Sequence, residues 1–259
     1  MKFEHKKSLG QNFLSNKNLL VALAADAQIL PTDNVLEIGP GLGSLTEQLA
    51  KNANKVLSVE TDLRLKEPLT EKFASTPSVQ FLFRDFLKTS FEEIEQILGN
   101  DYIVVANLPY YITTPILFRF FEEQNGAKKI AVMVQKEVAL RMTASPSCKD
   151  YGILSVACQH MGQTKILRQV ARQNFNPVPN VDSAFVLVEL QNKQNAKEFF
   201  NFSRLCFAMR RKTLVNNLKS KYEQQKVVDA LIKLGFGAAT RAEALAPNQL
   251  EQLFELLSK

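Results

Sequence analysis

Short apolar segments alternate with segments of helical periodicity along the first half of the chain, and this alternation restricts the fold more than any other feature. The apolar segments that predict strands are residues 34–38, 55–59, 79–83, 102–106 and 130–134. The segments between them that predict helices are residues 44–51, 63–73, 91–98 and 115–123. Strands that alternate with helices form a parallel sheet covered by helices on both faces. The sequence therefore predicts an α/β fold.

The last third of the chain departs from this alternation. Residues 165–170 and 183–190 are strand-like without a full helix between them, so we expect a hairpin at the sheet edge, completing a mostly parallel, seven-stranded sheet. The polar segment Gln191–Asn195 then marks a domain boundary. We predict one domain over residues 1–192 and a small all-α domain over residues 193–259. Its expected helices are residues 198–218, 224–234 and 247–257.

The composition is typical of a globular protein, and its basic net charge favours an acidic partner, although many basic proteins bind nothing acidic. The 259 residues are 46% hydrophobic and have a formal net charge of +6, which favours a polyanion such as nucleic acid. Three cysteines and two histidines are too few for a disulfide framework or a metal centre, so we expect no metal. No apolar stretch near the N-terminus resembles a secretory signal or a membrane span. We expect a cytoplasmic monomer that does not bind a membrane.

A glycine-rich loop, Gly39-Pro40-Gly41-Leu42-Gly43, connects the first predicted strand to the next helix. Glycines here let the backbone approach a ligand at the carboxyl edge of the sheet, where α/β proteins bind ligands. The spacing is one residue shorter than the dinucleotide-binding pattern. With Glu37 before it, the loop resembles the first motif of Rossmann-like class I methyltransferases. A tight strand-to-helix turn would need the same glycines, so a purely structural role is the alternative.

Two carboxylates follow the next two predicted strands. Glu60 ends the second strand, where an acidic side chain can accept hydrogen bonds from both hydroxyls of a ribose. Asp85 follows the third strand and can accept a hydrogen bond from the amino group of an adenine. Each position is also compatible with a solvated acid at a loop end. Together with the glycine loop, the two acids favour a nucleoside-containing cofactor.

The tetrapeptide Asn107-Leu108-Pro109-Tyr110 ends the fourth predicted strand at the same edge of the sheet. An adenine amine is a poor nucleophile because its lone pair is delocalised into the ring. The Asn107 side-chain amide and the Leu108 carbonyl can each accept one amino proton, which turns the lone pair toward a methyl donor. Pro109 rigidifies the turn, and Tyr110 offers a flat face on which a base can stack. The motif predicts methylation of an amine conjugated to a ring.

A second aromatic residue precedes the last predicted strand in Phe175-Asn176-Pro177-Val178-Pro179. Two prolines hold this segment extended, and Phe175 can cover the opposite face of the target base. A base stacked between Tyr110 and Phe175 would have to be flipped or single-stranded. Packing of Phe175 in the hydrophobic core is the alternative.

Taken together, these motifs resemble the KsgA/Dim family of ribosomal RNA adenine N6,N6-dimethyltransferases along nearly the whole chain. The matching segments are residues 7–14, 37–43, 107–110, 135–139, 151–156, 175–183 and 211–214. One departure is Leu9, where an aromatic residue is more usual. The resemblance implies a Rossmann-like class I methyltransferase fold and S-adenosylmethionine as the cofactor.

The resemblance also implies roles for individual residues. The residues expected to contact S-adenosylmethionine are Asn12, Leu14, Gly39, Gly41, Gly43, Glu60, Asp85 and Asn107. Those expected to handle the adenine are Asn107, Leu108, Pro109, Tyr110 and Phe175. The implied substrate is a pair of adjacent adenines in a hairpin near the 3′ end of 16S small-subunit ribosomal RNA, each methylated twice within an assembling 30S particle.

Basic residues near the N-terminus and after the domain boundary are candidates for RNA contact. Arg210, Arg211 and Lys212 lie in an expected helix whose apolar residues would be buried, leaving these charges for phosphates. Lys6 and Lys7 could extend the basic surface near the active site. A solvated helix face without any partner is the alternative for the three-residue cluster.

Three other functions remain open from the sequence. A resistance-type dimethyltransferase of large-subunit ribosomal RNA has related motifs, although Leu108 and the basic segment favour the small subunit. A non-catalytic RNA-binding or transcription factor with the same fold is a second alternative, disfavoured by the intact glycine loop and Asn107. A DNA adenine methyltransferase is a third, disfavoured because its proline usually follows the Asn or Asp directly, at the position of Leu108.

Overall fold

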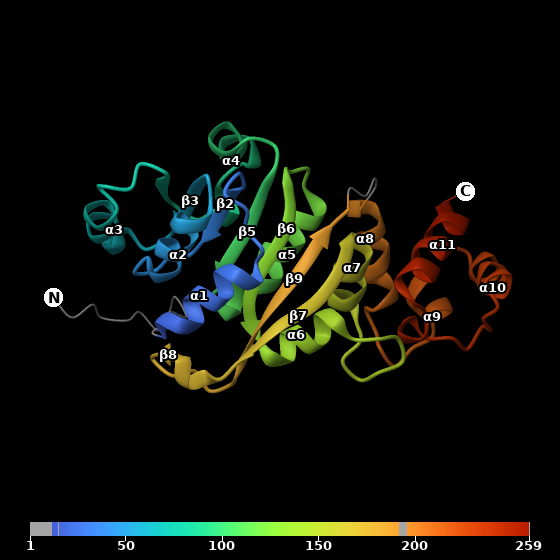
Figure 1. Cartoon of the computed structure of the whole chain (residues 1–259). Helices are drawn as coiled ribbons and strands as arrows, with labels where there is room; N and C mark the ends of the chain where they lie inside the picture. Colours follow the sequence, from blue (N-terminus) through green and yellow to red (C-terminus); the bar gives the residue numbers. More distant parts are fainter. Residues whose placement is uncertain (1–11, 15, 192–195, 259) are drawn as a thin grey trace. The chain divides into compact units, whose positions relative to one another are not determined.

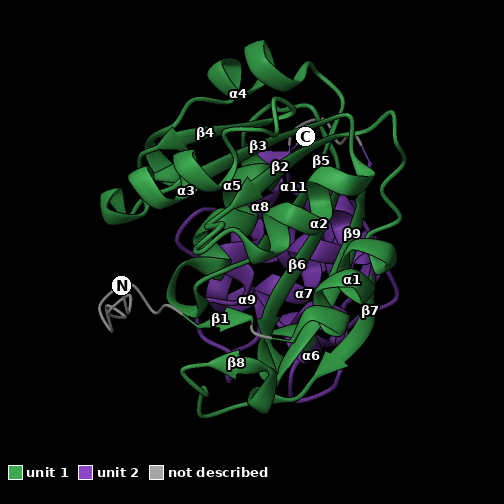
Figure 2. Ribbon diagram, turned by 60° about the vertical axis from the view of Figure 1, so that its left-hand side comes forward, with its two compact units in different colours: residues 1–139, 165–190 green, residues 140–164, 191–259 purple. Residues whose placement is uncertain are grey.

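A computed structural model describes residues 12–14, 16–191 and 196–258. The chain divides into two compact units, drawn in green and purple in Figure 2. Unit 1 consists of residues 1–139 and 165–190, and unit 2 of residues 140–164 and 191–259.

A seven-stranded sheet forms the centre of unit 1 (Figure 1). Its strands lie in the order β4-β3-β2-β5-β6-β9-β7, with β2 to β6 parallel to one another and β9 antiparallel to β6. The strand bounds are β2 Asn34–Ile38, β3 Lys55–Glu60, β4 Val79–Phe83, β5 Tyr102–Asn107, β6 Ala127–Gln135, β7 Gly162–Val170 and β9 Ser183–Leu190. The predicted α/β fold with a mostly parallel seven-stranded sheet is thereby confirmed.

Helices cover both faces of this sheet. Val35 and Leu36 point to opposite faces of β2 because side chains alternate along a strand, and both are fully buried. The helices of unit 1 are α1 Lys17–Asp26, α2 Ser44–Asn52, α3 Lys66–Lys72, α4 Phe91–Leu98 and α5 Thr113–Glu122. Helices α1 and α2 contact each other, and α4 contacts β2 and β3. The carboxyl ends of the parallel strands meet at one edge of the sheet, which is where the candidate site lies.

Several elements differ from those expected from the sequence. The expected helix over residues 63–73 is a short 3-10 turn, Leu63–Leu65, followed by α3. Helix α5 begins at Thr113, before Pro115, because proline is accommodated in the first turn, where its missing N–H has no helical partner. Helix α1 was not expected. The Asn16 side chain caps it by accepting from the amides of Asn18 and Leu19.

A two-stranded ribbon lies apart from the main sheet in unit 1. Strand β1, Phe13–Leu14, pairs antiparallel with β8, Phe175–Asn176. The pairing joins segments that are far apart in the sequence and that both belong to the motifs singled out above. It places Phe13 opposite Asn176, and Leu14 opposite Phe175.

Unit 2 is helical. Its helices include α7 Ile153–Met161, α8 Ala196–Cys206, α9 Leu214–Leu218, α10 Gln224–Lys233 and α11 Pro247–Ser258, and α6 Lys136–Thr143 ends in it. An aromatic cluster packs α7, α8 and α11 together: the His160 ring lies 4.1 Å from Phe199, and Phe254 lies 5.4 Å from Phe202, centroid to centroid. The continuous helix expected over residues 198–218 is wrong, because α8 ends at Cys206 and α9 begins only at Leu214.

The division into units differs from a single boundary near residue 192. The chain enters unit 2 at residue 140, returns to unit 1 at residue 165 and leaves it again after residue 190. Helix α7 explains the first excursion, because it packs against α8 and α11. The apolar residues of α7 are typical of a buried helix, but local hydropathy does not specify which helices α7 packs against.

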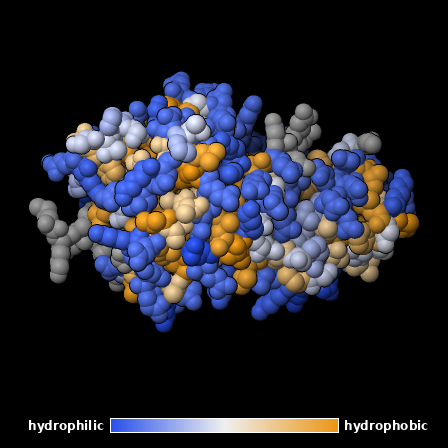
Figure 3. Space-filling model, in the orientation of Figure 1, coloured by the Kyte–Doolittle hydropathy of each residue, from blue (hydrophilic) through white to orange (hydrophobic). Residues whose placement is uncertain are grey.

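Hydrophilic residues predominate on the face drawn in Figure 3. Within the described part of the chain, no helix is long and apolar enough to span a membrane.

Candidate active site

A cavity in unit 1 lies at the carboxyl ends of β2, β3 and β5. Nine residues singled out from the sequence line it: Asn12, Gly39, Gly41, Glu60, Asp85, Asn107, Leu108, Pro109 and Tyr110. They come from five separate segments, and the parallel strands bring them together because the strands end at one edge of the sheet. Asn12 and Asn107 are far apart in the sequence, so it is the tertiary fold that brings these residues together.

The glycine loop has a backbone that other residues rarely adopt. Gly39, Gly41 and Gly43 have φ angles of +72°, +57° and +74°. A Cβ on Gly41 would overlap the ring of Phe13, which packs over the loop and also lines the cavity. Gly43 is different: it begins α2, and a Cβ there would come within 2.7 Å of the Phe73 ring. Gly39 and Gly41 line the cavity, whereas Gly43 lets the start of α2 pack closely against the Phe73 ring.

Glu60 at the end of β3 is buried, and backbone amides hold its carboxylate. Its Oε2 accepts from the amide of Gly41 at 3.1 Å, and its Oε1 accepts from the amide of Asp62 at 2.8 Å. Burial raises the pKa of this carboxyl, and the two amides oppose the rise. A carboxylate has about four acceptor sites, so Glu60 retains capacity for a ligand's hydroxyl groups.

Glu37 on β2 is more deeply buried than Glu60. Its Oε2 accepts from the hydroxyls of Thr46 at 2.6 Å and Ser58 at 2.7 Å, while Oε1 has no hydrogen-bond partner within the described ranges. Burial raises the pKa of Glu37 to about 7. Glu37 lines a smaller cavity beside the first, together with Gly39 and Asn107.

Asp85 follows β4 and organises the turn after it. Its Oδ1 accepts from the amide of Leu87 at 2.9 Å, and its backbone carbonyl accepts from the Thr89 hydroxyl at 3.0 Å. The carboxylate thus lies in the cavity lining with a fixed orientation and with acceptor sites that one amide does not fill.

The Asn107 side chain has a defined orientation. Its Nδ2 donates to the backbone carbonyl of Asn12 at 3.0 Å. Because the nitrogen end of the amide points to Asn12, the Oδ1 end is the one that remains for accepting a hydrogen bond from a ligand. Leu108, next in the chain, is buried, and Pro109 and Tyr110 continue the cavity wall.

Tyr110 is held through its hydroxyl. The Tyr110 and Ser183 hydroxyls lie 2.8 Å apart, which joins the wall of the cavity to the start of β9. Burial raises the pKa of Tyr110, so the phenol remains neutral at physiological pH. Tyr111 beside it lines the same cavity and is 56% exposed.

Comparisons with known proteins identify a family for the chain. A family model described as ribosomal RNA adenine dimethylase matches residues 2–259. The chain belongs to the ribosomal RNA adenine dimethylase family. The chain is 41% identical to the ribosomal RNA small subunit methyltransferase A of Bacillus cytotoxicus, with 98% of this chain and 92% of the relative covered. The protein of the same name from Bacillus mycoides shows the same identity and coverage.

Two solved structures resemble this dimethylase over nearly its full length. A dimethyladenosine transferase from Plasmodium falciparum has a TM-score of 0.80 at 26% identity, covering 93% of this chain and 95% of that one. The 23S rRNA methyltransferase ErmE has a TM-score of 0.73 at 28% identity, covering 96% and 100%. The family assignment makes this protein an S-adenosylmethionine-dependent enzyme that dimethylates adenine in ribosomal RNA.

Leu14 and Phe175 occupy the core of the dimethylase. Phe175 is 2% exposed and belongs, with Leu14, to the main hydrophobic cluster of unit 1. The ring is therefore part of this cluster and is absent from the wall of the main cavity. Leu14 lines the smaller cavity beside Gly39 and is absent from the wall of the main one. For Phe175 this geometry matches core packing, the alternative considered from the sequence.

The basic residues expected to bind RNA have different environments. Lys6 and Lys7 lie outside the described residues. Arg211 and Lys212 are exposed in the turn between α8 and α9. Arg210 instead donates to the carbonyls of Lys149 and Tyr151, both at 3.0 Å.

Two residues beside the cavity were not singled out from the sequence. Phe13 lies over the glycine loop, and Ser183 holds the Tyr110 hydroxyl. Both fall inside segments that resemble the family, residues 7–14 and 175–183. Motif membership was therefore the available signal, but it does not indicate which side chain of a motif faces the ligand.

Proposed function

We propose that the enzyme dimethylates two adjacent adenines near the 3′ end of small-subunit ribosomal RNA, acting as a monomer on an assembling small subunit. The observation on which this rests is the placement of Asn107 to Tyr110 in one cavity with Glu60 and Asp85. The relatives named for the small subunit are 41% identical, whereas the structure named for 23S rRNA is 28% identical. This difference favours the small subunit over the large one.

Unit 1 has the groups needed to bind the cofactor. We assign the ribose hydroxyls to Glu60 and the adenine amine to Asp85, because each carboxylate is fixed by a backbone amide and retains acceptor sites. We assign the amino-acid portion to the backbone of Gly39 and Gly41, which lines the cavity, and the missing Cβ of Gly41 makes room for the Phe13 ring over the loop. Gly43 supports the turn by packing on the Phe73 ring. S-adenosylmethionine, when bound, supplies a methyl group on a sulfonium leaving group.

The target adenine is assigned to Asn107 and the residues after it. The Asn107 Oδ1 and the Leu108 carbonyl accept hydrogen bonds from the two N–H groups of the amine, so that the nitrogen lone pair is directed at the methyl group. The hydrogen bond from Asn107 Nδ2 to the Asn12 carbonyl fixes which end of the amide faces the amine. Asn12 therefore acts on the target base by orienting Asn107.

Tyr110 provides a stacking surface in this proposal. Its neutral phenol is held by Ser183, so the ring keeps one orientation when a base enters the cavity. A general base is not required, because the methylated amine is acidic enough to lose its proton to water. Phe175 would join the stack only if the β1–β8 ribbon rearranged, because its ring is in the core.

Methyl transfer from labelled S-adenosylmethionine to purified ribosomal subunits tests the substrate. Unmethylated small subunits and large subunits are supplied separately, and the labelled adenines are mapped. We expect label only in the small subunit, on adjacent adenines near the 3′ end. Small subunits that already have both adenines dimethylated are the matched control and should accept none. Label confined to the large subunit would contradict the proposal.

A further inference from the structure

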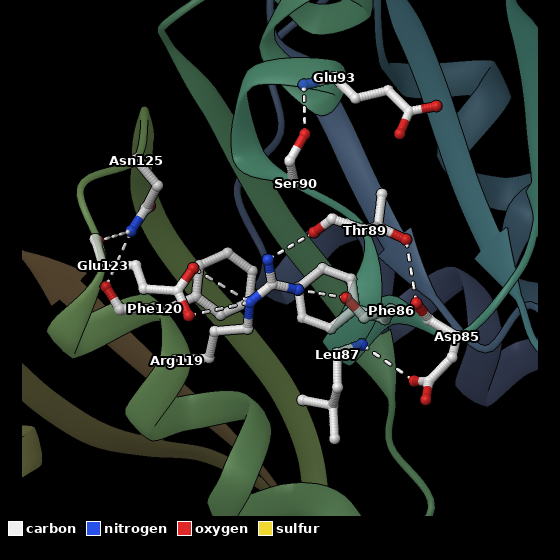
Figure 4. A network of polar contacts seen from close by, with 10 residues as sticks. All are labelled: Asp85, Phe86, Leu87, Thr89, Ser90, Glu93, Arg119, Phe120, Glu123 and Asn125. Atoms are coloured by element: carbon white, nitrogen blue, oxygen red, sulfur yellow. Dashed lines mark hydrogen bonds and ion pairs between the residues drawn. The ribbon is translucent and has the colours of Figure 1, made fainter.

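Arg119 of α5 is a buried arginine that contacts the turn after β4. Its side chain is 10% exposed. Figure 4 shows its guanidinium pointing into the turn that begins at Asp85. A buried arginine has to satisfy its donors, so the identity of its acceptors indicates what it does.

The acceptors are backbone carbonyls at two places in one turn. One terminal nitrogen of Arg119 donates to the carbonyl of Phe86, and the other donates to the carbonyl of Thr89. The guanidinium also contacts the exposed carboxylate of Glu123 at 3.3 Å, just after the end of the same helix. The planar guanidinium can hold two carbonyls at a fixed spacing, which a lysine ammonium does not do.

Aromatic rings enclose the guanidinium. Its central carbon lies 5.0 Å from the centroid of Phe86 and 4.6 Å from that of Phe91, distances typical of cation–π contacts. Phe120, the next residue of α5, stacks on Phe86 with centroids 5.4 Å apart. The turn is therefore held to α5 by both polar and aromatic contacts.

The position of this turn connects it to the cavity. Asp85, Phe86 and Leu87 all line the cavity, and Arg119 binds the carbonyl of the central one. Helix α5 begins at Thr113, three residues after Tyr110. One helix thus follows directly from the segment assigned to the target adenine and anchors the segment assigned to the cofactor.

We propose that Arg119 is a positioning residue for the cofactor, which fixes Asp85 and Leu87 against its adenine ring through the carbonyls of Phe86 and Thr89. This inference rests on the proposed assignment of Asp85. Arg119 itself lies outside the wall of the main cavity, so its effect is transmitted through the turn. Loss of the guanidinium should weaken cofactor binding while leaving the binding of RNA and the chemical step largely intact.

Binding of S-adenosylhomocysteine, measured by titration calorimetry, provides a readout that does not depend on turnover. We expect Arg119→Gln to raise its Kd about tenfold, as loss of charge-assisted hydrogen bonds does elsewhere. The KM for S-adenosylmethionine should rise similarly, with kcat at saturating cofactor and the KM for RNA changed less than about threefold. Arg119→Lys, which keeps the charge without the fork, should be intermediate, and it serves as the test variant if Arg119→Gln does not fold.

A double-mutant cycle with Asp85→Asn tests whether Arg119 acts through Asp85. If it does, adding Arg119→Gln to Asp85→Asn should weaken binding by much less than tenfold. If the increase in Kd of the double variant equals the product of the two single increases, the inference is overturned. A normal Kd in a folded Arg119→Gln protein would also overturn it. An unchanged Kd in Asp85→Asn alone would instead contradict the assignment of Asp85, so the two failures are distinguishable.

Two substitutions control for general loss of charge. Glu123→Gln removes the exposed ion pair of Arg119 but keeps both carbonyl contacts, and we expect an unchanged Kd. Arg168→Gln removes an exposed arginine that pairs with Asp26 at 2.6 Å elsewhere in unit 1. A rise of the Kd in both controls equal to that in Arg119→Gln would show a nonspecific effect and would overturn the inference.

Discussion

The cavity of unit 1 and the segment Arg210–Lys212 of unit 2 arrange charge in opposite ways. In the cavity, Glu60 is buried and bound by two backbone amides, so its position is fixed before any ligand arrives. In the segment, Arg211 and Lys212 are exposed in a turn. Polar groups that are fixed before the ligand binds favour a reaction that depends on the position of one atom. Exposed cations are sufficient for contacts to phosphates.

Arg210 shows that the contrast holds within a single run of basic residues. Its guanidinium binds two carbonyls of the segment from Lys149 to Tyr151, as Arg119 binds two carbonyls in unit 1. Neighbouring basic residues therefore have different environments: Arg210 binds backbone carbonyls, whereas Arg211 and Lys212 are exposed. Substitutions in both regions test this contrast, and the largest effect is expected in the cavity.

Substitution of Asn107 by alanine should have the largest effect on methyl transfer. The proposed reaction loses an acceptor for the adenine amine, and removal of one such preorganised group typically lowers kcat about 10²- to 10³-fold. RNA affinity should stay within about threefold of the wild type, because phosphate contacts dominate it. Single-turnover methylation and filter binding measure the two quantities.

Asn52→Ala is a matched control at the end of α2. Among the described residues, the Asn52 side chain binds the carbonyl of Gln48 in its own helix, at 2.7 Å, so turnover should be unaffected. Full activity of the Asn107→Ala enzyme would refute the role given to the side-chain amide.

The sequence predicts the central strands well because both faces of β2 and β5 are buried. Val35 and Leu36 are apolar in succession, and such runs identify central strands of a parallel sheet without knowledge of their neighbours. Glu60, Asp85 and Asn107 follow from the same pattern, because strand ends of one sheet meet at one edge. Local patterns were sufficient for these positions.

Other features depend on contacts between distant segments, and local patterns do not specify them. The ribbon that buries Phe175 requires pairing with Leu14, and the orientation of Asn107 requires the carbonyl of Asn12. The continuous helix expected through Arg210 is absent because a contact between distant residues ends α8 at Cys206. The Asn217 side chain donates to the carbonyl of Cys206 at 2.7 Å, which satisfies the end of α8 by a contact from α9.

Substitution of Glu37 should have the next largest effect, which is on the free energy of unfolding. Its pKa in the folded protein is about 7, against 4.5 for the unconstrained group, so the folded state holds this proton more tightly. The resulting stabilisation is complete below pH 4.5 and is lost as the pH rises through 7, by about 3 kcal/mol in total. Glu37→Gln, which mimics the protonated acid, should therefore gain stability relative to the wild type as the pH rises from 5 to 8.

Urea unfolding across this pH range measures the difference in the free energy of unfolding. Glu67→Gln, at an exposed position of α3, controls for the loss of one carboxylate from the surface. A pH-independent difference between Glu37→Gln and the wild type would contradict the assigned proton.

Arg210→Ala and Arg211→Ala should differ in stability although the residues are adjacent. Arg210 loses two hydrogen bonds to carbonyls and a 3.6 Å ion pair with Glu243, which should cost about 1 kcal/mol of unfolding free energy for a partly exposed side chain. Arg211→Ala should stay within about 0.5 kcal/mol of the wild type. Urea unfolding of both variants makes the comparison, and equal stabilities would remove the structural role of Arg210.

The smallest expected effect is on RNA binding by Arg211 and Lys212. Removal of one cation from a phosphate reduces the slope of log K against log salt concentration by about 0.7 for single strands, and up to about 0.9 for duplexes. If both side chains bind phosphates, the Arg211→Gln, Lys212→Gln variant should lower the slope by about 1.5, with little change in stability or in methyl transfer at saturating RNA. Lys233→Gln together with Lys226→Gln on α10 removes the same charge from another surface of unit 2. An identical slope change in both double variants would mean that net charge alone sets RNA affinity, and that the segment after α8 has no special part in it.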